Sequence, residues 1–113
     1  MDAREEILNQ LIDSVVNSEE HDSYVTMLEQ LKMYPDLLER VGEFRKRCFS
    51  YQFDDNADVL AENSRIESEF SDILTNRLVS DFLAAERQYC SLIKKLNNRF
   101  YESLDLDAGF LKG

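Results

Sequence analysis

Glycine and proline are scarce in this 113-residue sequence, which has three glycines, one proline and no tryptophan. A multi-stranded sheet needs many tight turns, which are usually built with glycine and proline, so their scarcity disfavours such a fold. Good helix formers such as Leu, Glu, Arg and Lys are plentiful instead. The length suits a single core, because domains typically hold about 100–150 residues. The composition therefore predicts one all-α domain over residues 1–113.

Cysteine is also rare, and the two that occur, Cys48 and Cys90, lack the paired spacing of a disulfide framework. Reduced thiols of this kind are typical of the cytosol. No apolar run approaches the roughly 18–20 residues that a membrane span requires. The N-terminal stretch 1–6 has neither the basic start nor the apolar segment of a secretion signal. We expect a cytoplasmic protein without membrane insertion.

Enzyme motifs are missing too. The sequence has no G-x-S-x-G, P-loop, dinucleotide fingerprint, HExxH or CxxC, and its only histidine is His21, for which we expect a solvent-facing or capping role. Asp54-x-Asn56-x-Asp58 begins like a calcium loop, but the required Gly and Glu are replaced by Val59 and Arg65. We therefore expect neither an enzyme nor a metal site.

Positive charge is in short supply, because 13 basic residues face 23 acidic ones and the formal net charge is −10. Nucleic acid binding relies on Lys and Arg to neutralise phosphates. A chain this acidic is repelled overall, although the local patch Arg45-Lys46-Arg47 could still touch a phosphate. We expect protein partners and no direct contact with nucleic acid.

Three helices are predicted in the first half of the chain. The first runs over residues 2–16, with Asp2 as its cap and Glu5 completing a capping box. Tyr34-Pro35-Asp36 separates the second helix from the third, because proline disfavours helical geometry in the residue before it and suits a first turn. Residues 52–57 are polar and predict a loop.

Two more helices follow, the fourth from residue 58 and the fifth over 77–103. The apolar phase breaks at Thr75-Asn76, which predicts a tight turn with Asn76 as the next N-cap. The fold predicted is a small bundle of about five helices with a long C-terminal helical hairpin. In that hairpin Phe70 and Ile73 pack against Phe82 and Leu83. The tail, residues 104–113, is expected to be loosely ordered.

The fifth helix is apolar over roughly half its circumference at 100° per residue, which is more than one neighbouring helix would cover. We predict a homodimer built largely on this helix, with the first helix as a second contributor. The predicted interface residues are Phe82, Glu86, Tyr89, Ile93, Leu96 and Phe100. The predicted core residues are Leu37, Val41, Phe44, Phe70, Phe82, Tyr89 and Ile93.

Three polar or reactive side chains fall on apolar helix faces. Cys48 and Cys90 are expected to pack as small hydrophobic residues. The alternative is a redox-sensing or cofactor-binding role, in which the two cysteines hold an iron–sulfur cluster shared between subunits, since a cluster needs about four thiolates. Glu86 is expected to pair with a basic or tyrosine side chain, because an unpaired buried carboxylate is costly. A role for Glu86 as an acid or base is the weaker alternative.

The stretch 24–101 resembles the YlbF/YmcA (Com_YlbF) family of small bacterial helical regulatory proteins. The features that match are Tyr24 opening a helix, then Tyr34-Pro35-Asp36, Leu38-x-x-Val41-x-x-Phe44, Asn76-x-x-Val79-x-x-Phe82-Leu83-x-Ala85-Glu86 and Leu92-Ile93-x-x-Leu96. Arg77 departs from the family pattern, in which proline is frequent at the same place.

This resemblance implies an all-α fold, often dimeric, without enzymatic activity. It implies a regulator or adaptor in competence, sporulation, biofilm formation and RNA processing. The partners it implies are YlbF/YmcA-like paralogues, a YaaT-like PSP1-domain protein and an RNA-processing endoribonuclease. Complexes of this kind can carry iron–sulfur clusters, but Cys48 and Cys90 match no cluster motif of the family.

Overall fold

A computed structural model of the chain describes residues 2–51 and 59–104, and the regular secondary structure of these residues is entirely helical. The helices are α1 (Ala3–Val16), α2 (Glu19–Leu31), α3 (Pro35–Tyr51), α4 (Val59–Glu69), α5 (Ser71–Leu74) and α6 (Arg77–Ser103). The predicted all-α class is confirmed. The predicted loop at 52–57 and nearly all of the predicted tail lie outside the described residues. None of the helices described is both long and apolar enough to cross a membrane.

The chain divides into two compact units whose boundaries fall within α2 and α6. Unit 1 comprises residues 1–24 and 84–113, and thus holds α1, the start of α2 and most of α6. Unit 2 comprises residues 25–83, with α3, α4, α5 and the first turns of α6. The assignment of one domain to residues 1–113 stays a prediction.

The predicted caps Asp2 and Asn76 and the predicted helix start at Pro35 are confirmed, whereas the part of Glu5 in a capping box stays a prediction. Asp2 caps α1, because its Oδ1 accepts hydrogen bonds from the backbone N–H groups of Arg4 at 2.7 Å and Glu5 at 3.1 Å. Pro35 is the first residue of α3. Asn76 immediately precedes α6, and its Oδ1 accepts from the backbone N–H of Val79 at 3.2 Å. Each cap satisfies donors that the first helical turn leaves without a partner.

Removing the Asn76 cap should destabilise the protein measurably. Asn76→Ala is expected to cost about 1 kcal/mol, because the N–H of Val79 loses its acceptor. Asn76→Asp keeps the acceptor and adds negative charge at the positive end of the helix dipole, so it should be at least as stable as the wild type. Urea denaturation of the wild type and the two variants measures their order of stability. An alanine variant as stable as the aspartate variant would contradict the capping role.

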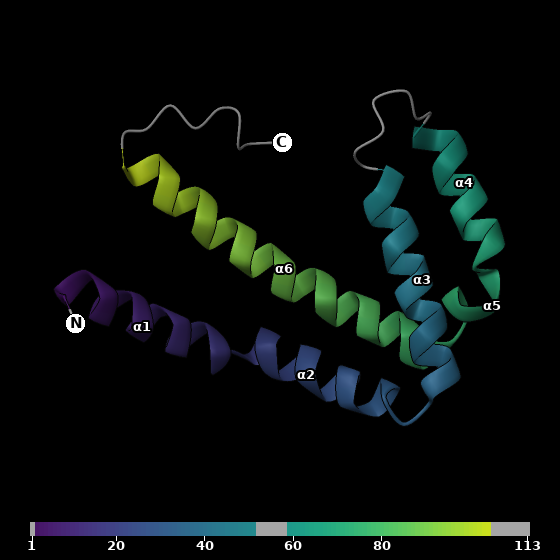
Figure 1. The fold of residues 1–113 in the computed structure, drawn as a ribbon, viewed down its shortest axis with the longest axis horizontal. Coiled ribbons are helices and arrows are strands. Elements are labelled where there is room, and N and C mark those ends of the chain that lie inside the picture. The colour runs from purple at the N-terminus through teal and green to yellow at the C-terminus, as the bar shows by residue number, and fades with distance from the viewer. Residues whose placement is uncertain (1, 52–58, 105–113) are drawn as a thin grey trace. The chain divides into compact units, whose positions relative to one another are not determined.

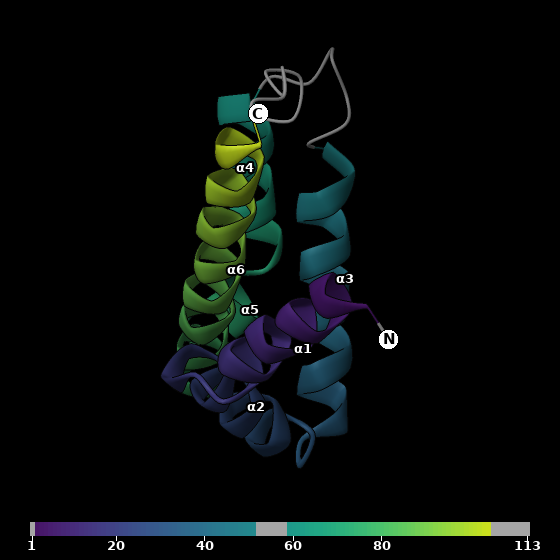
Figure 2. The ribbon, with the colours of Figure 1, turned by 90° about the vertical axis from the view of Figure 1, so that its left-hand side faces the viewer.

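Unit 2 has a core built on α3. This helix packs against α4 and α5, and α3 and α4 run in opposite directions (Figures 1 and 2). The rings of Phe44 and Phe70 meet edge to face with centroids 5.5 Å apart. The buried apolar residues of this unit are Leu31, Val41, Ile66, Phe70, Ile73, Val79 and Phe82.

The predicted core is confirmed in part. Val41, Phe70 and Phe82 are buried, and Leu37, Phe44 and Tyr89 are half-buried. The prediction for Ile93 is wrong, because 45% of this residue is exposed. Ile93 lies on the central apolar line of α6, but there it lines an open groove formed by described residues of unit 1.

The predicted fourth helix is in fact two helices, so the described chain has six and not five. Phe70 separates them, with φ −107° and ψ 18°, outside the α-helical region. Phe70, Ile73 and Phe82 are buried, as the predicted C-terminal hairpin requires, but α4 and α5 pack mainly against α3. The break at Thr75 and Asn76 is confirmed.

Candidate protein-binding groove

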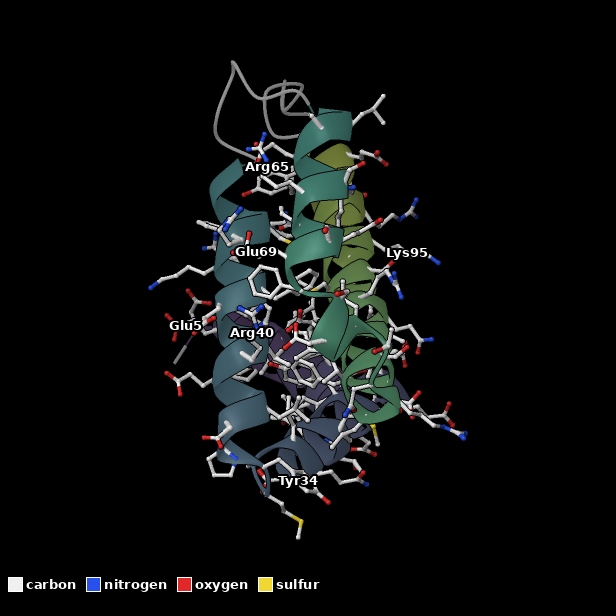
Figure 3. All side chains as sticks on the ribbon, turned by 90° about the vertical axis from the view of Figure 1, so that its right-hand side faces the viewer. Glu5, Tyr34, Arg40, Arg65, Glu69 and Lys95 are labelled. Carbon is white, nitrogen blue, oxygen red and sulfur yellow. The ribbon has the colours of Figure 1, made fainter. Side chains whose placement is uncertain are left out.

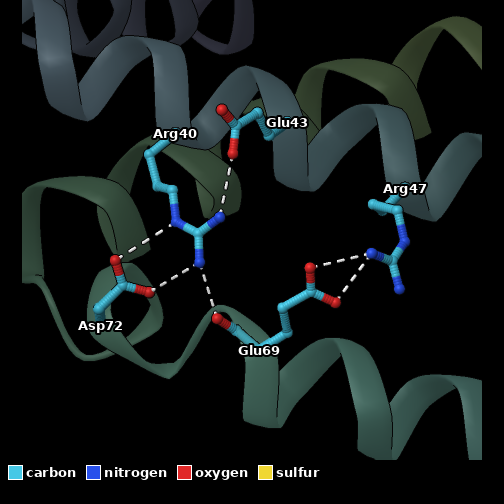
Figure 4. A network of polar contacts seen from close by, with 5 residues as sticks. All are labelled: Arg40, Glu43, Arg47, Glu69 and Asp72. Atoms are coloured by element: carbon cyan, nitrogen blue, oxygen red, sulfur yellow. Dashed lines mark hydrogen bonds and ion pairs between the residues drawn. The ribbon is translucent and has the colours of Figure 1, made fainter.

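A cluster of polar contacts in unit 2 centres on Arg40 of α3 (Figures 3 and 4). Its Nη2 donates to the backbone carbonyl of Glu69 at 2.7 Å, and its Nη1 donates to Glu43 Oε2 at 3.0 Å. Its Nε and Nη2 each lie 3.4 Å from a carboxylate oxygen of Asp72. The guanidinium carbon lies 4.2 Å from the centre of the Phe70 ring.

This cluster is a structural clamp. Glu69 ends α4, so its carbonyl lacks a helical partner and Arg40 supplies one. Arg47, also on α3, holds the Glu69 carboxylate at 2.8 and 3.0 Å from its Nη1. The two arginines therefore fix the break between α4 and α5 from the facing helix. Nothing in the sequence periodicity signalled this role.

Because of this clamp, we expect the stability of the folded protein to depend on pH in the acid range. The hydrogen bonds from Arg40 lower the pKa of Asp72 below its usual 3.8. A carboxylate whose folded pKa is depressed stabilises the fold above its unfolded pKa, and the stabilisation is lost as pH falls through the folded pKa. Asp72→Asn should thus be less stable than wild type at neutral pH, and the difference should shrink below a pH of about 4.

Urea midpoints at neutral and acid pH, measured at low salt, test this expectation. Asp81→Asn is the matched control, since Asp81 is exposed and forms no ion pair among the residues described. A difference between wild type and Asp72→Asn that stays constant with pH would contradict the clamp.

In unit 1, α1 presents an apolar face that the described residues of the unit leave exposed. None of its residues is buried. Its large apolar side chains are between 44% and 64% exposed: Ile7, Leu8, Leu11, Ile12 and Val16. They recur at the spacing of one helix face, which in a folded domain normally packs on a neighbour. The N-terminal helix therefore carries its apolar stripe on the surface.

All of these apolar residues of α1 except Ile7, together with Val15, form one wall of an apolar groove of about 420 Å³. The other wall is α6, which runs in the opposite direction to α1 (Figure 1). The lining residues are Leu8, Leu11, Ile12, Val15, Val16, Tyr89, Ile93, Leu96, Asn97 and Phe100. We call this feature the α1/α6 groove. An exposed, contiguous apolar surface of this kind is typical of a protein interaction site.

An aromatic cluster holds the start of α2 against α6. The rings of His21 and Tyr89 meet edge to face with centroids 5.4 Å apart. The ring of Tyr24 lies 5.5 Å from that of Tyr89. Tyr89, one of the groove residues, is thus held by the rings of both His21 and Tyr24, which restrict its orientation in the α6 wall of the groove. His21 is half-buried on Tyr89, so the expectation of a solvent-facing or capping histidine is wrong.

Most of the predicted interface residues are brought together in the groove, namely Tyr89, Ile93, Leu96 and Phe100. Phe82 is not available to a partner, because it has no exposed surface, and we correct its assignment to the core alone. Glu86 is half-buried and does not line the groove, so its place at a dimer seam stays a prediction. The sequence named α1 only as a second contributor, whereas it forms a whole wall.

The cysteines lie in different units, Cys48 in unit 2 and Cys90 in unit 1. Cys48 is half-buried as expected, and burial raises the pKa of its thiol. Cys90 is exposed, so its expected packing as a small hydrophobic residue is wrong; it stands at the edge of the apolar arc of α6.

Among residues 2–51 and 59–104, no group of three or more His, Cys, Asp or Glu side chains could hold a metal. The shared iron–sulfur cluster stays a prediction.

Comparison with known protein families gives a match. Residues 5–105 match the family model described as "Control of competence regulator ComK, YlbF/YmcA". This match covers both walls of the α1/α6 groove and the whole of unit 2. Comparisons with curated proteins and with solved structures give no match.

Proposed function

This chain belongs to the YlbF/YmcA family, and on that premise we propose that it is a non-catalytic regulator that works by binding proteins through the α1/α6 groove. The observation that carries the proposal is the uncovered apolar face of α1, opposite the apolar residues of α6. A catalytic site instead requires polar groups that converge on a pocket. Among the described residues that line the groove, most are aliphatic or aromatic, and Asn97 and the hydroxyl of Tyr89 supply its polar groups.

In this proposal, a second copy of the chain binds in the groove and forms a homodimer. A two-fold axis along the groove would pair α1 and α6 of one copy with α6 and α1 of the other, since a symmetric interface uses the same patch twice. This arrangement covers the apolar side chains of both copies at once. It also explains why neither wall of the groove closes on the other within a single chain.

The process that the protein regulates is inferred from its family. We place its action in the cytoplasm, in the control of competence named in the family description. Within that setting, family paralogues, a YaaT-like PSP1-domain protein and an RNA-processing endoribonuclease are the partners that the resemblance supports. A helical adaptor with a large apolar groove fits such assemblies, because regulatory subunits act by pairing with other chains.

Multi-angle light scattering at micromolar concentration tests the self-association. The expected mass is twice the 13.2 kDa of one chain. A mass of one chain across the accessible concentration range would remove the second copy as the occupant of the groove.

A further inference from the structure

The stretch 87–99 of α6 concentrates positive charge in an otherwise acidic chain. Between residues 87 and 99 there are four basic residues and no acidic one, although the chain as a whole has a formal charge of −10. These basic residues are Arg87, Lys94, Lys95 and Arg99. All of them are exposed, and the side chain of Lys95 extends outward from its helix (Figure 3).

These cations share one side of α6. At 100° per residue they flank a line through Ser91 and Asn98, opposite the line through Ile93 and Phe100 that faces the groove. Two open depressions lie along this side, lined in part by Lys95 and Ser91, which belong to both. We call the set Arg87, Ser91, Lys94, Lys95, Asn98 and Arg99 the basic face. At 1.5 Å per residue it is about 18 Å long.

Carboxylates of the described chain do not neutralise these cations. In unit 2, by contrast, Arg40 and Arg47 are held by Glu43, Glu69 and Asp72. The side chains of Arg87, Lys94, Lys95 and Arg99 form no ion pair with any residue that the structure describes. Four cations without an ion-pair partner on one helix face present a local field of opposite sign to the net charge of the protein.

We propose that the basic face binds a short acidic segment of a partner protein, with carboxylates spaced one helical turn apart. Carboxylates at that spacing match the Arg87, Ser91, Lys95 row, and Lys94 and Arg99 flank it. Leu92 lines one of the two depressions and offers apolar contact to the same segment. The groove lies on the other side of α6, so a dimer closed through the groove keeps both basic faces open.

The length and borders of the face favour a peptide over a nucleic acid. Glu20 lines one depression and Glu102 the other, so negative charge borders the face on both sides. A continuous polyanion would have to pass these carboxylates and the acidic remainder of the chain, which repel phosphates. A segment with a few carboxylates ends before it reaches them.

The test uses the full chain and a fluorescein-labelled helical peptide with Glu at positions i, i+4, i+7 and i+11 in an alanine-rich background. Fluorescence anisotropy should show binding that weakens at about 1 M salt, where the Debye length is about 3 Å. The double variant Lys94→Glu and Lys95→Glu should bind about tenfold more weakly or worse. The same peptide with Gln in place of Glu should not bind.

The control variant, Arg4→Glu with Lys46→Glu, makes the same change in net charge at two exposed cations outside the basic face. It should bind the Glu peptide like the wild type. Equal loss in both double variants, or no binding of the Glu peptide by the wild type, would overturn the proposal. Binding of an unstructured single-stranded RNA in place of the peptide, lost in the Lys94 and Lys95 variant, would overturn it in favour of nucleic acid. Circular dichroism and the light-scattering mass confirm that each variant is folded and that the groove is unaffected.

Discussion

Replacing Phe82 by Ala is expected to destabilise the protein by about 3–5 kcal/mol. Phe82 has no exposed surface, so the whole ring volume would become a cavity or force the surroundings to collapse. The guanidinium of Arg45 lies 5.7 Å from the ring centre and would lose that contact too. Small domains are stable by only about 5–15 kcal/mol, so the loss is a large share of the total.

Chemical denaturation followed by circular dichroism measures this loss as a lower midpoint at constant m-value. Phe49→Ala is the matched control, because Phe49 also belongs to unit 2 and is 64% exposed. That substitution removes the same atoms and should shift stability by about 0.5 kcal/mol or less, as surface changes usually do. Similar losses in the two variants would show that Phe82 is not the core residue its burial indicates.

Phe82 and Phe100 show that helical periodicity predicts which residues share a helix face but not which of them are buried. They are eighteen residues apart, which is five full turns, so at 100° per residue they lie on the same line of α6. The pattern therefore assigns both to one apolar face. One is fully buried and the other is 59% exposed. The difference depends on which other segments reach each end of the helix, and periodicity within one helix holds no information about that.

Helix ends were predictable because their signals are local. Pro35 and Asn76 act on the residues directly after them, and the structure starts α3 at Pro35 and α6 at Arg77, as predicted. The division of α4 from α5 was not predictable, since Arg40 contacts Asp72 from 32 positions away in the sequence. A salt bridge of that range leaves no trace in the spacing of apolar residues.

The candidate site divides in the same way. The apolar residues of α6 that line the groove were identified from the excess width of its apolar arc, which is a local property. Placing α1 opposite them required knowledge of which helix packs next to α6. Charge could have revealed the basic face earlier, because residues 87–99 contain basic residues and no acidic one.

A glutamate in the groove is expected to split the dimer into single chains. Ile12 is 47% exposed and lines the groove from α1, so Ile12→Glu should leave the isolated chain folded. In the dimer, the two-fold axis would bury two such carboxylates without partners. Each costs several kcal/mol, so the dissociation constant should rise by about 100-fold or more. Ile93→Glu should act alike from the opposite wall, because Ile93 is also exposed in one chain and also lines the groove.

Light scattering over a dilution series measures both variants against the wild type, and circular dichroism checks that the helices are retained. Leu60→Glu is the control, since Leu60 is 79% exposed and belongs to α4, in unit 2. It adds the same charge at an exposed leucine and should keep the wild-type mass. If only one of the two groove variants dissociates, the seam runs along a single wall. If both keep the wild-type mass while Leu60→Glu loses it, the interface lies on unit 2 and the groove is not where copies of this chain meet.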